Sequence, residues 1–159
     1  MMNYKKMYQS PLGVMWMCSD GKFLTGLWFE ESRDSLKHEG EYVEKDLDIF
    51  KQTSHWLDIY FSGKQPHFIN RIPYGKVITY NDIAKEIAKQ KGINKISAQA
   101  VGGAVGWNPI CIIIPCHRVV GANGSLTGYG GGIQNKINLL KLEKNDISKF
   151  IIPIKGTAL

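Results

Sequence analysis

Residues 112–120 of the chain are Ile112-Ile113-Ile114-Pro115-Cys116-His117-Arg118-Val119-Val120. In this stretch a run of β-branched residues leads to a cysteine that follows a proline and precedes an imidazole and a guanidinium. Neighbouring positive charge favours the thiolate, so Cys116 is a candidate activated nucleophile. The alternative is a buried structural cysteine at the end of a core strand, because free cysteines are mostly buried.

Length and composition indicate a soluble globular protein of one domain, or of one domain with a small appendage. The chain has 159 residues, of which 43% are hydrophobic and 21% are charged. No window approaches the ~18 apolar residues of a membrane-spanning helix, and the N-terminus is too polar for a signal peptide. The three cysteines are odd in number and form no C-x-x-C pair. We therefore expect a cytoplasmic protein without a membrane partner.

The charge balance favours a polyanionic partner, although only weakly. The net charge is +6, from 20 Lys and Arg against 14 Asp and Glu. Acidic residues concentrate between Glu30 and Asp58 and are sparse from Gln65 onward. The basic half of the chain is therefore the half that contains Cys116.

The first half of the chain predicts a small unit of strands and one helix. Residues 8–18 and 22–29 are expected to be strands joined by a hairpin at Asp20-Gly21. Residues 30–44 predict a loop, and apolar positions from about Lys45 to Phe61 suit a helix. Cys18 falls at the end of the first strand, where we expect a structural role.

A connector from Pro66 to Pro73, with a turn at Ile72-Pro73-Tyr74-Gly75, separates this unit from the second half. Thr79 then predicts the start of a helix, because Asp82 follows three residues later as in a capping box. We expect this helix to end at Gly92 and a second helix to run from Ser97 to Trp107. Such a helix pair in a basic region resembles a helix-turn-helix, although helix pairs also serve as plain scaffolding.

The second helix is built almost entirely of small residues. Each interior glycine costs roughly 1 kcal/mol of helix propensity relative to alanine. Val101 and Val105 form the expected buried edge, while Gln99 and Gly103 point to the opposite side. A flat outer face lets another backbone approach closely. Another helix is one candidate, and a nucleic acid is the candidate that the charge balance favours.

A glycine-rich loop and a last helix follow the cysteine. Residues 121–132 contain no phosphate-binding motif, but Tyr129 among the glycines is a candidate wall for a flat ligand in a loop that acts as a lid. The last helix is expected from Gln134 to Asn145. Glu143 continues its apolar face with a carboxylate, and a buried carboxylate needs a partner. His117 is the first candidate, and Arg118 or a lysine would also serve.

These residues assemble into a candidate nucleophilic site. On a regular strand the side chains of Cys116 and His117 would point to opposite faces, but Pro115 favours a turn that lets both face one pocket. A chain from the thiol through a water to His117, with Glu143 fixing the ring tautomer, would activate the thiol. Zinc is the rival use of cysteine and histidine, but no histidine has a recognisable ligand spacing with Cys116. We expect no metal.

The stretch from Ile114 to Val119 resembles the active-site signature of the 6-O-alkylguanine-DNA alkyltransferases, the methylated-DNA–protein-cysteine methyltransferases. The resemblance covers about residues 65–145, and the N-terminal part matches only in general character. Besides that stretch it includes Ala98–Asn108-Pro109, Ile72-Pro73-Tyr74-Gly75, Tyr80, Gly128-Tyr129, Lys136, Leu139-Leu140 and Glu143.

The resemblance implies an α+β fold. A small α/β unit on an antiparallel sheet, ribonuclease-H-like, would span residues 1–65. A mostly helical, winged-helix-like DNA-binding domain with a helix-turn-helix would span residues 66–159. The implied activity is DNA repair, in which Cys116 takes a methyl or larger alkyl group from the 6-oxygen of guanine and is not regenerated. No cofactor is used.

The resemblance also implies the role of each site residue. His117 would be the water-mediated base, Glu143 its orienting carboxylate, and Asn108 the brace of the turn that places Cys116. Tyr80 would contact the DNA phosphate and help to protonate the departing guanine. The other expected DNA contacts are Ala98, Gln99, Ala100, Gly102, Asn81 and Arg118. The expected pocket residues are Tyr129, Gly130, Gly131, Val119 and Pro115.

The expected partner is double-stranded DNA that carries an alkylated guanine. A monomer would bind its minor groove and flip the damaged nucleotide out to reach the thiol. Position 99 departs from the family, in which arginine is common; Gln99 brings no charge and predicts weaker and less salt-dependent binding. The N-terminal zinc ligands of some members find no clear counterparts here.

Two other classes of protein remain as alternatives. A non-catalytic module that recognises alkylated guanine and recruits repair factors is one of them, but related proteins of that kind lack the acceptor cysteine. A cysteine hydrolase or redox protein is the other, and the missing second thiol and the small-residue helix argue against it. The range of alkyl groups and the role of the N-terminal unit do not follow from the sequence.

Overall fold

The computed structural model describes residues 2–38, 40–66 and 72–154. The chain divides into two compact units, of which unit 1 contains Met1–Ile69 with Pro109–Ile113 and unit 2 contains Asn70–Asn108 with Ile114–Leu159. The predicted boundary at residues 65 and 66 borders residues 67–71, which lie outside the described residues, and it stays a prediction. Most of the predicted connector between Pro66 and Pro73 lies outside them too.

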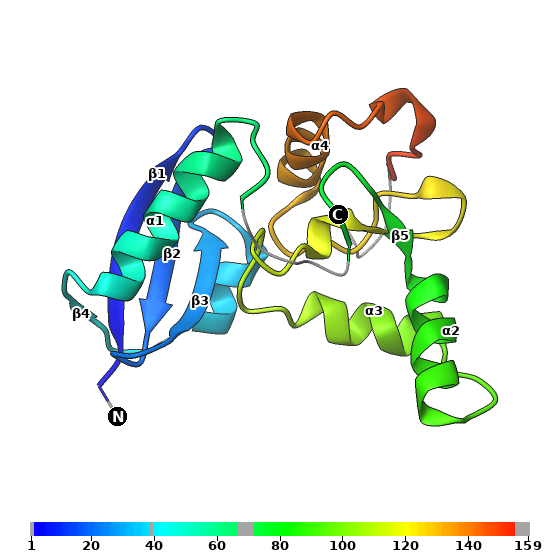
Figure 1. Cartoon of the computed structure of the whole chain (residues 1–159), viewed down its shortest axis with the longest axis horizontal. Helices are drawn as coiled ribbons and strands as arrows, with labels where there is room; N and C mark the ends of the chain where they lie inside the picture. Colours follow the sequence, from blue (N-terminus) through cyan, green and yellow to red (C-terminus); the bar gives the residue numbers. More distant parts are fainter. Residues whose placement is uncertain (1, 39, 67–71, 155–159) are drawn as a thin grey trace. The chain divides into compact units, whose positions relative to one another are not determined.

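Unit 1 is a four-stranded sheet with a helix on one face (Figure 1). Its strands lie in the order β3-β2-β1-β4, antiparallel except for the parallel pair of β1 and β4. The apolar side chains between sheet and helix are at most 1% exposed, namely Met15, Met17 and Leu27 from the strands and Phe50, Leu57 and Tyr60 from the helix. The elements in chain order are β1 (Tyr4–Ser10), β2 (Gly13–Ser19), β3 (Leu24–Phe29), the 3-10 helix η1 (Arg33–His38), β4 (Val43–Glu44) and α1 (Asp48–Phe61).

The single strand predicted over residues 8–18 is wrong, because the structure has two strands joined by a turn at Pro11-Leu12. The hydroxyl of Ser10 accepts a hydrogen bond from the Leu12 amide at 3.1 Å and donates one to the Gly13 carbonyl at 2.7 Å. Gly13 has a φ of +116°, a region in which residues with a Cβ are rare. Ser10, Pro11 and Gly13 are turn-forming residues inside the predicted strand. The hairpin predicted at Asp20-Gly21 is confirmed between β2 and β3.

A short segment from the second half of the chain completes unit 1. Pro109–Ile113 runs beside β3, where the Leu27 amide donates to the Pro109 carbonyl at 2.9 Å and the Cys111 amide donates to the Leu27 carbonyl at 3.0 Å. Cys111 and Cys18 are both buried in this unit, at 2% and 3% exposure. Burial raises the pKa of the Cys18 thiol to about 11, so this thiol is protonated at neutral pH. The burial of Cys18 agrees with the structural role expected for it.

Unit 2 is mostly helical. Its core contains the buried residues Val120, Leu126, Ile137 and Leu140, against which Val77, Ile133, Ile147 and Phe150 pack. β5 and β6 form a two-stranded parallel sheet. The elements are β5 (Ile78–Thr79), α2 (Tyr80–Lys91), α3 (Ala98–Gly106), η2 (Cys116–Arg118), β6 (Val119–Val120), η3 (Ala122–Gly124), α4 (Ile133–Leu142) and η4 (Ile147–Lys149).

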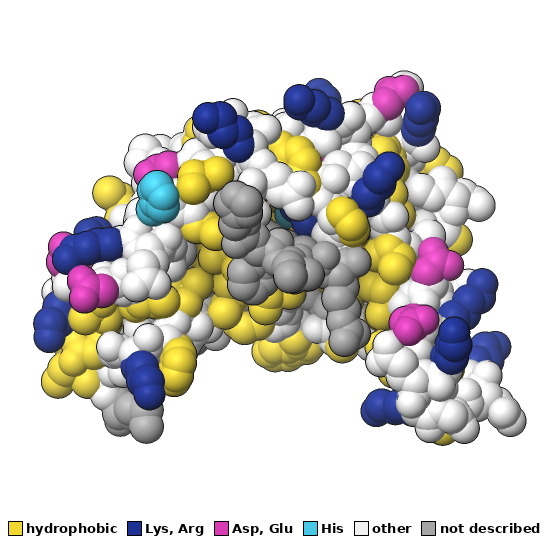
Figure 2. Space-filling view, in the orientation of Figure 1, with side chains coloured by type: hydrophobic (Ala, Val, Ile, Leu, Met, Phe, Trp, Pro, Cys, Tyr) yellow, Lys and Arg dark blue, Asp and Glu magenta, His cyan; other side chains and the backbone are white. Residues whose placement is uncertain are grey.

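The helix pair of unit 2 follows its local sequence signals. Thr79 and Asp82 form the predicted capping box at the start of α2, and Gly92 ends that helix in the left-handed conformation. The hydroxyl of Ser97 caps α3 by accepting from the Ala100 amide at 3.0 Å. Figure 2 shows Lys and Arg side chains gathered at the end of α2. The helix pair and the sheet of unit 1 together confirm the predicted α+β class.

No helix within the described ranges combines the length and the apolar character that crossing a membrane requires.

Candidate active site

Cys116 begins a turn of 3-10 helix in unit 2. Cys116–Arg118 form η2 directly after Pro115, and the Arg118 amide donates to the Pro115 carbonyl at 3.0 Å. A 3-10 helix has three residues per turn, so successive side chains are about 120° apart and not on opposite faces as in a strand. The turn predicted at Pro115 is confirmed. Cys116 is half-buried, whereas Pro115 and His117 are buried.

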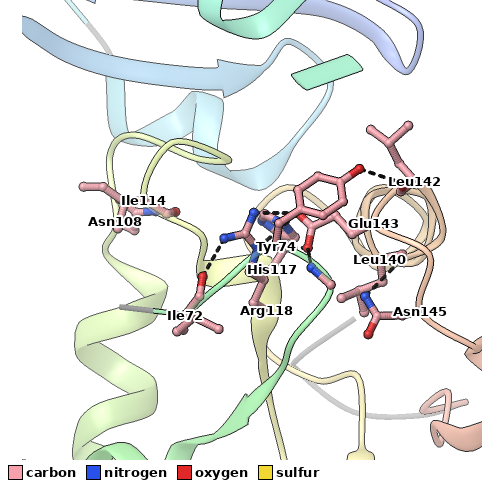
Figure 3. Close-up of polar contacts among 11 residues, drawn as sticks. Ile72, Tyr74, Asn108, Ile114, His117, Arg118, Leu140, Leu142, Glu143 and Asn145 are labelled. Carbon is pink, nitrogen blue, oxygen red and sulfur yellow. Dashed lines mark hydrogen bonds and ion pairs between the residues drawn. The ribbon is translucent and has the colours of Figure 1, made fainter. Parts of the chain in front are cut away.

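Asn108, two residues past the end of α3, holds this turn from one side. Its side-chain amide donates to the Ile114 carbonyl at 2.9 Å and to the sulfur of Cys116 at 3.0 Å. Figure 3 shows Asn108 next to Ile114. A donor at the sulfur favours the thiolate over the thiol, because it stabilises the charged acceptor.

His117 lies on the other side of the turn and contacts Glu143, which follows α4 (Figure 3). The Nε2 atom of His117 is 2.7 Å from Oε1 of Glu143, and both side chains are 0% exposed. An ionised carboxylate only accepts hydrogen bonds, so Nε2 carries the proton in this pair. That tautomer makes Nδ1 the basic nitrogen of the ring.

Both partners of this pair have perturbed pKa values. Burial by itself raises the pKa of Glu143, but hydrogen bonds from His117 and Arg118, together with their charges, outweigh burial and lower it to about 2. Burial lowers the pKa of His117 and outweighs the attraction of Glu143, which acts in the opposite direction. At neutral pH His117 is therefore a neutral base that faces a carboxylate.

The predicted DNA contact of Arg118 is wrong. It was expected to contact DNA, but it is 3% exposed and its guanidinium binds Glu143 through Nε and Nη2, each at 2.9 Å. Its Nη1 donates to the Ile72 carbonyl at 2.6 Å, and its guanidinium lies over the ring of Tyr74. A side chain buried in this way presents no donor to a DNA surface. Glu143 has both predicted partners, His117 and Arg118.

Tyr80, the first residue of α2, reaches toward the cysteine turn. Its hydroxyl donates to the Thr127 carbonyl at 3.3 Å, and its ring lies beside Gly102 of α3. Burial and, next, the charge of Cys116 raise the pKa of Tyr80. The phenol therefore keeps its proton at neutral pH and remains a donor.

Lys136 is a site residue that the sequence interpretation assigned no role. It is 0% exposed in α4, and its ammonium donates to the carbonyls of Val119 at 2.6 Å and Thr127 at 2.9 Å. Burial lowers its pKa to about 8, against an opposing attraction from Cys116. A signal was present in the sequence, because Lys136 lies three and four residues before Leu139 and Leu140 on the apolar face.

The residues predicted to line a pocket lie near these groups. Val119 is 3% exposed and Tyr129 is 4% exposed, and Gly130 and Gly131 are buried. The ring of Tyr129 stands edge-on to His117, with centroids 6.4 Å apart. The glycines therefore belong to a packed segment around His117, and the predicted lid movement of this loop stays a prediction.

Apart from Arg118, the predicted DNA-binding residues lie on α2 and α3. Gln99, Ala100 and Asn81 are exposed, whereas Ala98 and Gly102 are half-buried. Among the described residues, no three or more His, Cys, Asp or Glu side chains come together as a metal site would require.

The chain is similar to known proteins over most of its length. Residues 63–145 match the family model described as 6-O-methylguanine DNA methyltransferase, DNA binding domain, and residues 3–73 match the ribonuclease-like domain of the same methyltransferase. Methylated-DNA–protein-cysteine methyltransferases from Methanosarcina mazei and Methanosarcina acetivorans are 38% and 35% identical to it. The alignments cover 91% and 88% of this chain and 99% and 97% of those proteins.

A solved structure agrees with these matches. The Mycobacterium tuberculosis OGT in complex with DNA is 36% identical, with a TM-score of 0.73 over 92% of this chain and 94% of that one.

Proposed function

Because this chain belongs to the 6-O-methylguanine DNA methyltransferase family, we propose that Cys116 is the residue that accepts the alkyl group in its repair reaction. The chain is a DNA repair protein that transfers a methyl or alkyl group from alkylated guanine in DNA irreversibly to its own cysteine. Its relatives are named for transfer to a protein cysteine. The cysteine turn of unit 2 is the part of this chain whose geometry supports that chemistry.

The observation that carries this assignment is the contrast among the three cysteines. Cys18 and Cys111 are buried in unit 1, whereas Cys116 is half-buried and accepts a hydrogen bond from Asn108 at 3.0 Å. The next residue, His117, is a neutral base held by Glu143. A thiol with a donor at its sulfur and a base next to it has the features of an activated nucleophile.

The reaction is a single displacement. The sulfur of Cys116 attacks the alkyl carbon, and the new S–C bond forms as the bond from that carbon to the guanine oxygen breaks. The thiol proton moves through a water to Nδ1 of His117, where Glu143 stabilises the resulting imidazolium. Guanine leaves with the electron pair and takes a proton from the hydroxyl of Tyr80. The proton that His117 received returns through water to the Tyr80 oxygen, so both side chains end as they began. The S-alkyl cysteine remains, so each chain reacts once.

Asn108, Lys136 and Arg118 position the reacting groups. Asn108 holds the sulfur, and Lys136 ties the Val119 and Thr127 carbonyls together beside it. Arg118 fixes both oxygens of Glu143. None of these roles requires a cofactor or a metal.

The partner that we propose is a duplex with an alkylated guanine, bound by a monomer in the cytoplasm. α3 enters the minor groove with Gln99, Ala98, Ala100 and Gly102, and Tyr80 and Asn81 contact the backbone from α2. The damaged nucleotide is flipped out, because a base inside a duplex does not reach a half-buried thiol. The flat outer face of α3 permits the close approach that this mode of binding needs.

The test is mass spectrometry of the full chain after incubation with a duplex that contains 6-O-methylguanine. We expect one methyl group on the peptide with Cys116, none on the peptides with Cys18 and Cys111, and none on any peptide of Cys116→Ala. An unmodified Cys116 peptide in a protein that binds the same duplex tightly would replace this proposal with the non-catalytic binding module.

A further inference from the structure

Trp107 is an exposed aromatic residue that the proposed reaction does not use. It caps the C-terminal end of α3 and is 74% exposed. Of the four tryptophans, all of which lie in the described part of the chain, Trp28 is buried and Trp16 and Trp56 are half-buried. Single exposed apolar residues are common on protein surfaces, so the surroundings of Trp107 decide what its exposure means.

Those surroundings are the outer face of α3. Exposed residues recur along the helix at Gln99, Ala100, Gly103, Ala104 and Trp107. The spacing of three and four residues places them in one stripe. Gln99 stands at one end of the stripe and Trp107 at the other, about 12 Å further along the axis at 1.5 Å per residue. Trp107 therefore places a large aromatic side chain at one end of an exposed helix face that is otherwise built mostly of small residues.

Trp107 stands at the end of this face that leads to the nucleophile. It directly precedes Asn108, whose amide contacts the Cys116 sulfur at 3.0 Å and the Ile114 carbonyl at 2.9 Å. Ile114, the residue at the other end of that hydrogen bond, is 50% exposed. Two exposed apolar residues, Trp107 and Ile114, therefore lie within two residues of the groups that hold the Cys116 sulfur in place.

The helix itself offers no charge to a DNA backbone. α3 has no acidic or basic residue in its first or last turn, and its sequence from Ala98 to Gly106 contains none. Any affinity that this face provides must come from apolar packing and neutral hydrogen bonds. An exposed indole is the side chain of this face with the most apolar area for such packing.

We propose that Trp107 is a DNA-contacting residue that packs its indole against the strand carrying the flipped-out nucleotide, at the sugar and base edge next to the lesion. The inference rests on the proposed function and extends it. The contact supplies affinity that does not depend on neutralising phosphates, on a helix that lacks the charged residue common at position 99. Gln99 and Trp107 then bracket the lesion from the two ends of α3.

The test measures binding of the full-length Cys116→Ala protein, which cannot turn over, to a duplex with one 6-O-methylguanine across a series of salt concentrations. Adding Trp107→Ala is expected to weaken binding roughly tenfold, the scale of one lost aromatic contact to a nucleotide. The slope of log affinity against log salt is expected to stay the same, because no phosphate contact is lost. Trp107→Phe is expected to restore most of the affinity.

The matched control is Ile93→Ala, which truncates an exposed apolar residue, at 47% exposure, in the loop before α3. That change is expected to leave the dissociation constant unchanged. Acrylamide quenching of tryptophan fluorescence gives a second measurement: bound duplex is expected to protect the parent protein and to leave the Trp107→Phe variant almost unaffected.

An unchanged dissociation constant in Trp107→Ala, or equal protection of the two proteins from quenching, would overturn the inference. A change in the salt slope would also overturn it, since it would mean that phosphate contacts were altered. Failure of methyl transfer to Cys116 would instead refute the proposed function, and the two failures are distinguishable because the binding experiment does not involve the thiol.

Discussion

The hydroxyl of Tyr80 stands 2.7 Å from the position that a Cβ on Gly128 would occupy. Gly128 also has a φ of +77°, which residues with a Cβ rarely adopt. The glycine loop therefore leaves the space into which the Tyr80 hydroxyl fits, and two requirements, backbone conformation and space, both call for glycine at this position.

We predict that Gly128→Ala lowers both stability and repair rate. The left-handed backbone costs about 1–2 kcal/mol with a Cβ, and the clash displaces the hydroxyl that protonates guanine. Gly63→Ala is the matched control, because Gly63 has a φ of +79° and an added Cβ would meet nothing within 4 Å. Urea unfolding should show a loss in both variants, larger in Gly128→Ala because of the clash, and single-turnover repair should be slowed in Gly128→Ala alone. Equal repair rates would contradict the role given to Tyr80.

We predict that Glu143→Gln destabilises the protein by about 3 kcal/mol, because it leaves the buried guanidinium of Arg118 without its counter-charge. It should also slow methyl transfer, since the amide no longer stabilises an imidazolium on His117. The comparison is Asp46→Asn, which breaks an exposed ion pair with Lys6 and should leave the free energy of unfolding nearly unchanged, because exposed ion pairs contribute little. Similar losses in the two variants would argue against a special role for the buried pair.

Acid should destabilise the protein through Glu143. Its pKa falls from 4.5 to about 2 on folding, so the folded protein holds fewer protons on this group than the unfolded chain does. The stabilisation is complete above about pH 4.5 and is lost as the pH falls toward 2. The lowered pKa of His117 acts with the same sign, below its ordinary pKa of 6.5. Urea titrations at decreasing pH should show a steeper fall for the wild type than for Glu143→Gln.

Lys136 should make the free energy of unfolding depend on pH in the alkaline range. Its pKa falls from 10.5 to about 8 on folding, so the folded state releases this proton first and the free energy of unfolding rises with pH between about 8 and 10.5. The difference curve between the wild type and Lys136→Met should contain this rise. A flat difference curve for Lys136→Met would refute the prediction.

We predict that Gln99→Arg binds duplex DNA more tightly than the wild type and with a steeper salt dependence, because the new charge displaces counterions. Gln134→Arg is the control, since it adds the same charge at an exposed position of α4. Filter binding across a salt series separates the two effects. Equal affinity and equal slope for Gln99→Arg and the wild type would remove position 99 from the interface.

Local signals predicted the parts of the fold that depend on neighbouring residues. The capping box of Thr79 and Asp82 involves residues three apart, and Gly92 ends its helix through its own backbone. The turn at Pro115 was predictable for the same reason. The turn at Pro11-Leu12 was missed although Ser10, Pro11 and Gly13 are local turn signals, because the segments before and after them both suit strands.

The charged residues of the site were harder to place. Arg118 was expected among the DNA contacts and also as a candidate partner of Glu143, and only the second expectation agrees with its burial. Its partner Glu143 lies 25 residues away, and no local pattern shows which of several cations such a carboxylate will meet. The position of Lys136 on the apolar face predicted its burial, but its two acceptors could not be predicted, because backbone carbonyls are present in every residue.

Because Cys18 and Cys111 are buried, a thiol reagent should label the folded chain at a single cysteine. A water-soluble thiol dye should react with one sulfur per folded molecule, that of Cys116, because Cys18 and Cys111 are only 3% and 2% exposed. Labelling a sample before and after it has met damaged DNA then counts molecules that have already reacted. Because each chain reacts once, the number of molecules that no longer take up the dye equals the number of lesions that were repaired.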